Sequence, residues 1–254
     1  MKNAFQEHGY LKSKINPLFL SSKARSEIKI LRNNFDSLTR DPYSETRSNR
    51  FRSYSNLIIL PWDRKIIWLP LENKNGRYVS SYWQGGFNPE HADAYRSFTP
   101  LSSEVKKTNF LNNLILHDFD LTFWKMENTL PIYVGVHFIK LLVLEKNEIA
   151  FSSPDLLHRD GEAFTFAHLF ERKNVQGGVN YISTPELANS KIDDVPEDKI
   201  LTKFELHEPF ESYAVCDEMV SHYVSPIKID NPVLSHGSRE IILIDFSTVQ
   251  QQII

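Results

Sequence analysis

The chain has 254 residues, of which 41% are hydrophobic, with a formal net charge of −3 and a sequence pI near 6.3. This length suffices for one large β-rich domain or two small ones, and we expect a single domain over residues 1–254. The charge provides no basic field for a nucleic acid or an anionic membrane, so a small molecule is the expected partner.

The cysteine content and the first residues bear on the compartment. Cys216 is the only cysteine, and the N-terminal stretch lacks the apolar core of a signal peptide. No run approaches the ~18 apolar residues that cross a bilayer. We therefore expect a cytoplasmic chain with no intrachain disulfide and no membrane partner. The oligomeric state, including a homodimer, is left open.

The N-terminal part predicts a helix and then a loop. Apolar residues recur at partly helical spacing over 17–38, within an N-terminal segment, 1–45, that we expect to pack on the core. In the loop that follows, Arg40, Arg47, Arg50 and Arg52 lie within 13 residues. Two interpretations stay open, namely a solvated face with surface ion pairs, or capture of an anion by planar guanidinium groups.

The rest of the chain predicts mainly strands. We expect one helix over 101–118, behind Thr99 and Pro100, and a central strand over 131–143, the longest β-like run. The other expected strands cover 57–60, 66–69, 78–83, 163–170, 178–183, 201–206, 211–216, 219–224 and 239–247. Short strands at this spacing indicate a double-sheet sandwich. The predicted fold class is mainly β with flanking helices, and its core covers residues 50–250.

Two histidines and an acidic residue form a candidate metal site. His158 and Asp160 stand two residues apart, so on a strand their side chains would share a face. His222 lies in another short apolar run. Two imidazoles and one carboxylate on one face of a metal are the ligands of non-haem Fe(II) oxygenases. With 9 His and 32 acidic residues, about one His-x-Asp/Glu pair arises by chance, so the pair alone proves little.

Two other histidines fit such a site less well. His91 and Asp93 repeat the spacing, but they follow Pro89 and indicate a turn that enters a helix. His168 is ten residues from His158, about 33 Å along a strand, so we expect it to be structural.

Six stretches carry a resemblance to a known family. They cover residues 50–55, 134–137, 152–162, 177–182, 220–226 and 239–246. In this order they resemble the bacterial 2-oxoglutarate- and Fe(II)-dependent dioxygenases of the L-isoleucine dioxygenase type, which hydroxylate free amino acids. The resemblance spans roughly residues 45–250. It implies a double-stranded β-helix, a cupin-like jelly roll, with Fe(II) bound by His158, Asp160 and His222. It also implies 2-oxoglutarate and O2 as cosubstrates, with ascorbate as an aid in vitro.

The resemblance implies hydroxylation of an unactivated C–H bond of a free, aliphatic L-amino acid or a close derivative, with release of succinate and CO2. Arg239 opens an apolar strand, where a buried guanidinium needs an anion, and is the candidate for the distal carboxylate of 2-oxoglutarate. It lies 17 residues after His222, farther than in many relatives of the wider superfamily. His236 and Lys228 are the alternatives.

The remaining candidates concern the ligands of this site. His137 matches a histidine of the resembling enzymes and would contact the cosubstrate, unless it is a satisfied core histidine. Glu162 is the candidate for the substrate amino group. Arg52 or Arg50 is the candidate for the substrate α-carboxylate, and Tyr54 or Trp83 for an apolar wall. Arg96 matches an arginine of the family, but no role for it follows from the sequence.

Two competing hypotheses keep the β-sandwich. One is a cupin-like hydrolase or isomerase, in which Zn²⁺ or Mn²⁺ acts on water or an enediol. The other is a non-catalytic binding module whose metal residues are incidental. A hydrolase or isomerase needs no cation for 2-oxoglutarate, so an arginine at Arg239 that faces the metal argues against it.

Overall fold

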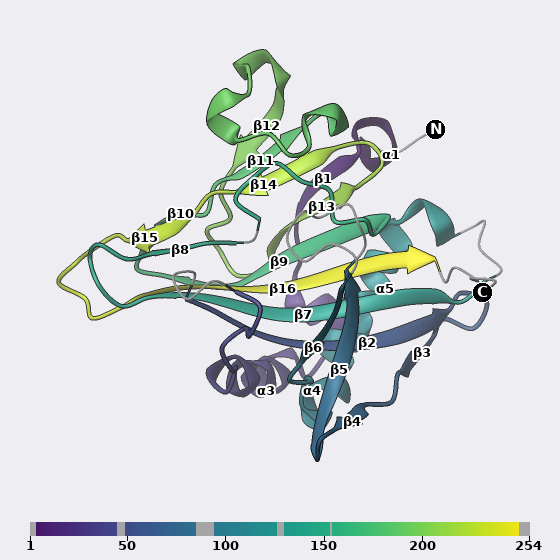
Figure 1. Ribbon diagram of the computed structural model, residues 1–254. Coiled ribbons are helices and arrows are strands. Elements are labelled where there is room, and N and C mark those ends of the chain that lie inside the picture. The colour runs from purple at the N-terminus through teal and green to yellow at the C-terminus, as the bar shows by residue number, and fades with distance from the viewer. Residues whose placement is uncertain (1–3, 45–48, 85–93, 126–129, 153, 249–254) are drawn as a thin grey trace.

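The computed structural model describes residues 4–44, 49–84, 94–125, 130–152 and 154–248. Within them, helices cover one side of a large sheet and further strands cover the other side (Figure 1). The helices are α1 (Ala4–His8), α2 (Pro17–Leu20), α3 (Ala24–Asp36), α4 (Ser103–Lys106) and α5 (Asn109–Leu121). The 3-10 turns are η2 (Phe123–Lys125), η3 (Pro185–Leu187), η4 (Ile192–Asp194) and η5 (Glu197–Lys199).

The large sheet has seven antiparallel strands in the order β1-β13-β9-β16-β7-β2-β3. They are β1 (Tyr10–Lys14), β13 (Glu211–Cys216), β9 (Phe164–Lys173), β16 (Gly237–Thr248), β7 (Ile132–Val143), β2 (Arg50–Leu60) and β3 (Lys65–Trp68). β7 lies between β16 and β2, so the prediction of a central strand over 131–143 is confirmed.

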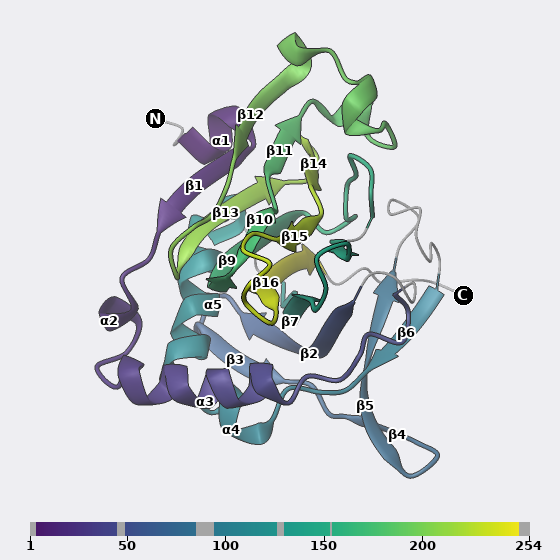
Figure 2. The same ribbon diagram turned by 90° about the vertical axis from the view of Figure 1, so that its left-hand side faces the viewer.

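Two smaller sheets lie over β9, β16 and β7 (Figure 1). One is β10 (Val175–Gly177), β15 (Ile227–Ile229) and β8 (Ile149–Ala150), and the other is β12 (Ile200–Phe204), β11 (Asn180–Ser183) and β14 (Ser221–Val224). These two antiparallel layers form the double-stranded β-helix that was expected, and the fold class is confirmed. A third small sheet, β4 (Glu72–Lys74), β5 (Arg77–Gln84) and β6 (Ala94–Phe98), contacts β2 at the side of the sandwich (Figure 2).

The two faces of the large sheet differ because side chains alternate along a strand. On the helix side, Phe35 of α3 stacks on Phe138 of β7 and Phe170 of β9, with ring centroids 4.6 Å apart in both cases. Five buried side chains of α5 join the same core: Phe110, Leu111, Leu114, Ile115 and Phe119. Full burial of each such side chain stabilises the fold by roughly 1.5–3 kcal/mol. The opposite face of the sheet is left for a polar site between the layers.

Two predicted helices are each divided in the structure. The helix expected over 17–38 is interrupted at Ser21, whose extended backbone (φ −157°, ψ 133°) ends α2. The helix expected over 101–118 is interrupted at Thr108, which is also extended and accepts a hydrogen bond from Leu111 N at 3.3 Å as the N-cap of α5. An N-cap residue such as Thr108 favours a new helix start over continuation of the previous helix.

Other predictions were incomplete or lie outside the described residues. The segment around Tyr10 forms an edge strand, β1, which the sequence did not indicate. Arg47, and His91 with Asp93, lie in the stretches that the structure does not describe. No helix in the described part of the chain has the length and apolar character needed to cross a membrane.

Candidate active site

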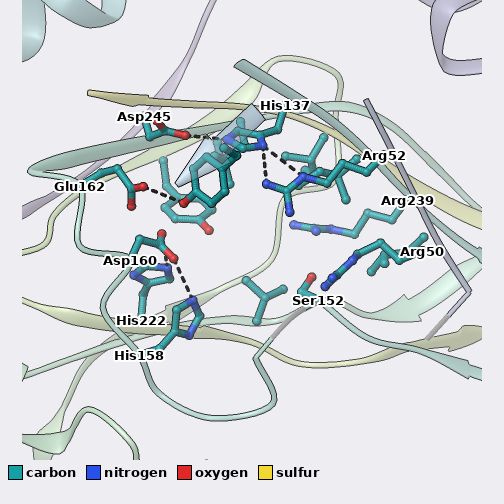
Figure 3. A pocket seen from close by; sticks show the side chains of 18 of the residues that line it. Arg50, Arg52, His137, Ser152, His158, Asp160, Glu162, His222, Arg239 and Asp245 are labelled. Atoms are coloured by element: carbon teal, nitrogen blue, oxygen red, sulfur yellow. Dashed lines mark hydrogen bonds and ion pairs between the residues drawn. The ribbon is translucent and has the colours of Figure 1, made fainter. Parts of the chain in front are cut away.

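His158 and His222 lie side by side because their backbones form an antiparallel bridge. The N–H of each donates to the carbonyl oxygen of the other, at 2.9 Å in both cases, and the ring centroids are 4.2 Å apart. The carboxylate of Asp160 lies 3.5 Å from His158 Nε2 and 3.3 Å from His222 Nε2 (Figure 3). The structure therefore brings together the three residues predicted as metal ligands.

The local backbone differs from the prediction. His158 forms an isolated bridge and Asp160 lies in a loop, so the expectation of a strand here was wrong. Asp217 holds this loop, because its carboxylate accepts hydrogen bonds from Asp160 N at 3.0 Å and Gly161 N at 2.7 Å. No sequence motif marks Asp217, since its partners are backbone groups.

The donor atoms of the three residues suit a divalent cation. The candidate ligand atoms lie within 4.8 Å of one another. His158 Nδ1 lies 2.9 Å from Leu156 O, so Nδ1 carries a proton, and Nε2 can offer its lone pair to a metal ion once it no longer donates to Asp160. Two imidazole nitrogens and a carboxylate oxygen form a set that suits Fe(II). The residues present therefore fit this metal.

The charges of the group agree with cation binding. Burial alone would raise the pKa of Asp160, but attraction to His222 and hydrogen bonds from both histidines hold it well below its usual value. Burial alone would lower the pKa of His222, but Asp160 outweighs this effect and raises it. The carboxylate of Asp160 thus favours a positive charge beside it, which a metal ion would supply in place of a proton.

Alternate residues of three neighbouring strands line a pocket beside this group. They are Arg50 and Arg52 of β2, His137, Ile139 and Leu141 of β7, and Arg239, Ile241, Leu243 and Asp245 of β16. Arg50 and Arg239 both pair with Leu141 in the sheet register, from opposite sides. Figure 3 shows Arg50, Arg52 and Arg239 across the pocket from His158, Asp160 and His222. The pocket is therefore cationic opposite the candidate metal ligands.

Arg239 is buried and forms no ion pair with a carboxylate among the described residues. Only 3% of it is exposed, and its Nε has no hydrogen-bond partner in the described part of the chain. Burial, with repulsion from Arg172, lowers the pKa of Arg239 to about 10. The alternatives His236 and Lys228 are exposed and do not line the pocket. Of the three candidates for the distal carboxylate of 2-oxoglutarate, Arg239 is thus the one that lines the pocket.

Arg50 and Arg52 differ in their partners. Arg50 Nε donates to Asp41 Oδ2 at 2.9 Å, and both side chains are buried. Arg52 Nε donates instead to His137 Nδ1 at 3.1 Å, and His137 Nε2 donates to Asp245 Oδ2 at 2.7 Å. Burial, followed by repulsion from Arg52, lowers the pKa of His137 to about 4, so the imidazole is neutral. The charge of Arg50 is therefore balanced by a directly bonded carboxylate, whereas the direct partner of Arg52 is neutral.

Glu162 faces the pocket from the side of the metal group (Figure 3). Tyr82 Oη donates to its Oε1 at 2.7 Å, while Oε2 is buried and has no partner among the described residues. Burial, together with repulsion from Asp245 and Asp160, raises the pKa of Glu162 well above its usual value. This is the behaviour of a carboxyl group that lacks a cation beside it.

The predicted apolar wall was wrong. Tyr54 is fully buried behind the pocket, where its ring centroid lies 4.5 Å from that of His137. Trp83 is 47% exposed and packs on Tyr95, away from the pocket. Tyr82 and Tyr213 line the pocket instead. Trp83 is one position from Tyr82, and neighbouring strand residues point to opposite faces, so Tyr82 faces the pocket and Trp83 faces away.

Two lining residues carry charges that the sequence reading did not use. Asp245 is a charged residue within an apolar strand, as Arg239 is. The same sequence pattern could therefore have predicted that Asp245 faces the site. Arg96 lines the pocket from β6. His168, predicted to be structural, is buried away from the pocket lining, with Nδ1 2.8 Å from Ser212 Oγ and Nε2 2.8 Å from Asp118 Oδ2.

Comparisons with known proteins agree with this geometry. A family model described as 2OG-Fe dioxygenase matches residues 32–245. The chain is 26% identical to the L-isoleucine-4-hydroxylase of Bacillus thuringiensis over 248 residues, which are 96% of this chain and 92% of that protein. It is 30% identical over 168 residues to the 3(1)-hydroxy-L-isoleucine 4-dioxygenase of Pantoea ananatis, a match that spans 62% of this chain and 61% of the relative.

Solved structures show the same fold. The crystal structure of IDO from Bacillus thuringiensis superposes with a TM-score of 0.72 at 21% identity, over 97% of this chain and 92% of that one. The Fe(II)/α-ketoglutarate-dependent dioxygenase TqaL superposes with a TM-score of 0.70 at 11% identity, over 98% and 85% of the two chains.

Proposed function

Because the chain belongs to the 2OG-Fe dioxygenase family, we propose that it hydroxylates an unactivated C–H bond of a free, aliphatic L-amino acid or a close derivative. The family uses Fe(II) and 2-oxoglutarate, and the products would include succinate and CO2. Bound Fe(II) and 2-oxoglutarate supply the O2 activation that attack on such a bond requires. The residues of the chain bind, orient and shield the reactants.

The metal and the cosubstrate have distinct sets of residues in this proposal. His158, Asp160 and His222 would hold the metal, which would bind the cosubstrate and O2 for the oxidation. Arg239 donates to the distal carboxylate of 2-oxoglutarate. A planar guanidinium can make two parallel hydrogen bonds to a carboxylate, and this bond is strongest where water is excluded.

An amino acid as the substrate is supported chiefly by Oε2 of Glu162, which has no hydrogen-bond partner in the described part of the chain. A buried acceptor without a donor is costly, and a substrate ammonium group would supply both the donor and the missing positive charge. Arg52 lies across the pocket, where its guanidinium suits the α-carboxylate (Figure 3). The apolar lining, which includes Ile139, Val224, Ile241 and Leu243, suits an aliphatic side chain. The Bacillus relative is named for L-isoleucine, itself an aliphatic amino acid.

The test is succinate formation by the purified chain with Fe(II), 2-oxoglutarate, O2 and ascorbate, measured with each of the twenty L-amino acids. We expect one or more aliphatic amino acids to stimulate succinate formation and to gain one oxygen atom by mass spectrometry. No stimulation by any amino acid would overturn the proposed substrate class. Product formation that needs no 2-oxoglutarate would instead favour a cupin-like hydrolase or isomerase.

A further inference from the structure

Arg96 lines one wall of the pocket. The proposed function so far gives it no part in binding the metal or 2-oxoglutarate. It lies on β6 directly opposite Tyr82 of β5, and both side chains line the pocket. Arg96 is only 5% exposed. Its guanidinium carbon lies 5.0 Å from the ring centroid of Tyr82 and 5.5 Å from that of Phe98.

Arg52 reaches the same two rings from the large sheet. Its guanidinium carbon lies 4.4 Å from the centroid of Phe98 and 5.7 Å from that of Tyr82. Two positive groups therefore share one aromatic pair inside the pocket. Burial, followed by repulsion from Arg52, lowers the pKa of Arg96 to about 10. Both side chains line the pocket, so an anion bound there could accept hydrogen bonds from both guanidinium groups.

The surroundings identify the kind of anion. Tyr82, which separates the two guanidinium groups from Glu162, donates its hydroxyl to Glu162 Oε1 at 2.7 Å. Two cations thus lie at the ring of Tyr82, and Glu162, whose Oε2 has no partner among the described residues, lies at its hydroxyl. A free amino acid carries its carboxylate and its ammonium group on the same carbon atom, so these two charges match the two sides.

We propose that Arg96 and Arg52 together bind the α-carboxylate of the substrate, while Glu162 accepts from its ammonium group. This inference rests on the proposed function and specifies its substrate class. The enzyme therefore favours an amino acid with a free carboxylate over the corresponding amide or ester and over the same residue within a peptide. The hairpin of β5 and β6 is then a recognition element, since Arg96 and Tyr82 both belong to it.

The first test compares Arg96→Gln with Arg77→Gln, an exposed arginine on the same hairpin. The probe is the amino acid with the highest turnover in the panel of twenty. We expect Arg96→Gln to raise the KM for this amino acid by about 10- to 100-fold, the effect of losing one hydrogen-bonded charge. The KM for 2-oxoglutarate and the affinity for Fe(II) should not change, and Arg77→Gln should match the wild type. Arg96→Lys should recover part of the loss, and it carries the same test if Arg96→Gln does not fold.

The second test uses the C-terminal amide of the same amino acid. The wild type should bind the amide more weakly than the free amino acid by a similar factor. Arg96→Gln should not weaken binding of the amide further, because the amide already lacks the carboxylate that Arg96 contacts. Equal losses for acid and amide, or a raised KM for 2-oxoglutarate, would overturn the role of Arg96 while the proposed function stands. A preference for L-aspartate or L-glutamate that Arg96→Gln removes would also overturn it, by assigning Arg96 to a side-chain carboxylate. If no amino acid supports turnover in the wild type, the proposed function itself fails.

Discussion

His222 tests the candidate metal centre at the scale of a single residue. His222→Ala removes one of two imidazole donors, so we expect it to abolish stoichiometric binding of Fe(II) in anaerobic calorimetric titration, along with succinate formation. His236→Ala is the matched control, because His236 is exposed and away from the pocket. Undiminished metal binding by His222→Ala would remove this residue from the ligand set.

His137 makes the stability of the fold depend on pH. Its pKa is about 4 in the folded chain against an ordinary value of 6.5. Between these values the unfolded chain binds more protons. The contribution of neutral His137 to the free energy of unfolding is therefore complete above pH 6.5. It is lost as the pH falls toward 4, and it amounts to a total on the order of 3 kcal/mol. The neutral ring can donate to Asp245 and accept from Arg52, but a protonated ring could not accept.

The prediction concerns the free energy of unfolding in urea, measured for the wild type and His137→Gln. The free energy of unfolding of the wild type minus that of His137→Gln should be about 2 kcal/mol smaller at pH 5.0 than at pH 7.5, because the variant lacks the group that titrates. An advantage that stays constant between these two values would contradict the assigned protonation state.

At this scale the sequence could predict residues whose chemistry is visible in a local pattern. His158 and Asp160 stand two apart, and Arg239 is a charge within an apolar run. It could not identify Tyr82 or Asp217, because each acts on a residue more than 50 positions away through contacts that only the fold creates. His137 was left between contact with the cosubstrate and a role in the core, and its hydrogen bonds to Arg52 and Asp245 form only once β2, β7 and β16 are aligned.

At the scale of elements, the turn that leads from β10 into β11 gives Arg239 its space. Gly178 has a positive φ of 68°, and a Cβ at this position would lie 3.1 Å from both Cδ and Nε of Arg239. Gly178→Ala should therefore displace the guanidinium and raise the KM for 2-oxoglutarate by about tenfold or more. Gly76→Ala is a matched control, because Gly76 has φ +80° but nothing within 4 Å of its Cβ position.

The two glycine variants separate backbone strain from displacement. Both should lose about 1 kcal/mol or more of stability, since alanine disfavours positive φ. Only Gly178→Ala should change the dependence of succinate formation on 2-oxoglutarate. An equal KM for 2-oxoglutarate in the two variants would mean that Arg239 does not hold this ligand or tolerates the added methyl group.

The elements also show where sequence patterns succeed. The longer strands were predicted because alternation and β-branched residues persist over enough positions, as in β7 and β16. The short strands β8, β10 and β15 were missed, since two or three residues carry no periodicity and pair only after the layers close. Helix boundaries failed at Ser21 and Thr108, where a hydrogen-bonding side chain or an extended backbone outweighs apolar spacing.

At the scale of the whole molecule, the sandwich holds unbalanced charges that its ligands would neutralise. We expect Mn²⁺, used without O2 as a substitute that does not turn over, to raise the free energy of unfolding. 2-Oxoglutarate should raise it further, by about 2.7 kcal/mol at a concentration 100 times its Kd. In Arg239→Ala the increment from Mn²⁺ should remain, but the increment from 2-oxoglutarate should fall. If 2-oxoglutarate raised the free energy of unfolding equally in the wild type and in Arg239→Ala, the proposed binding of its distal carboxylate by Arg239 would be contradicted.

That the chain forms one domain over residues 1–254 stays a proposal. In the described part of the chain, Arg32 of α3 supports it with hydrogen bonds to Glu171 of β9 and Glu240 of β16, which tie the N-terminal helices to the large sheet. Removal of residues 1–45 should therefore expose the apolar core rather than release an independent segment.

The alternation along β16 also determines which changes in chain length the pocket can tolerate. Arg239 and Asp245 are six positions apart, an even number, and both therefore face the pocket while Ile242 and Ile244 face the helices. One residue inserted between them would turn either the arginine or the aspartate into the apolar core. One residue inserted into the exposed stretch 231–236 would leave both faces unchanged. Between Arg239 and Asp245 the chain can therefore tolerate only an even number of inserted residues, whereas in the loop 231–236 it can tolerate any number.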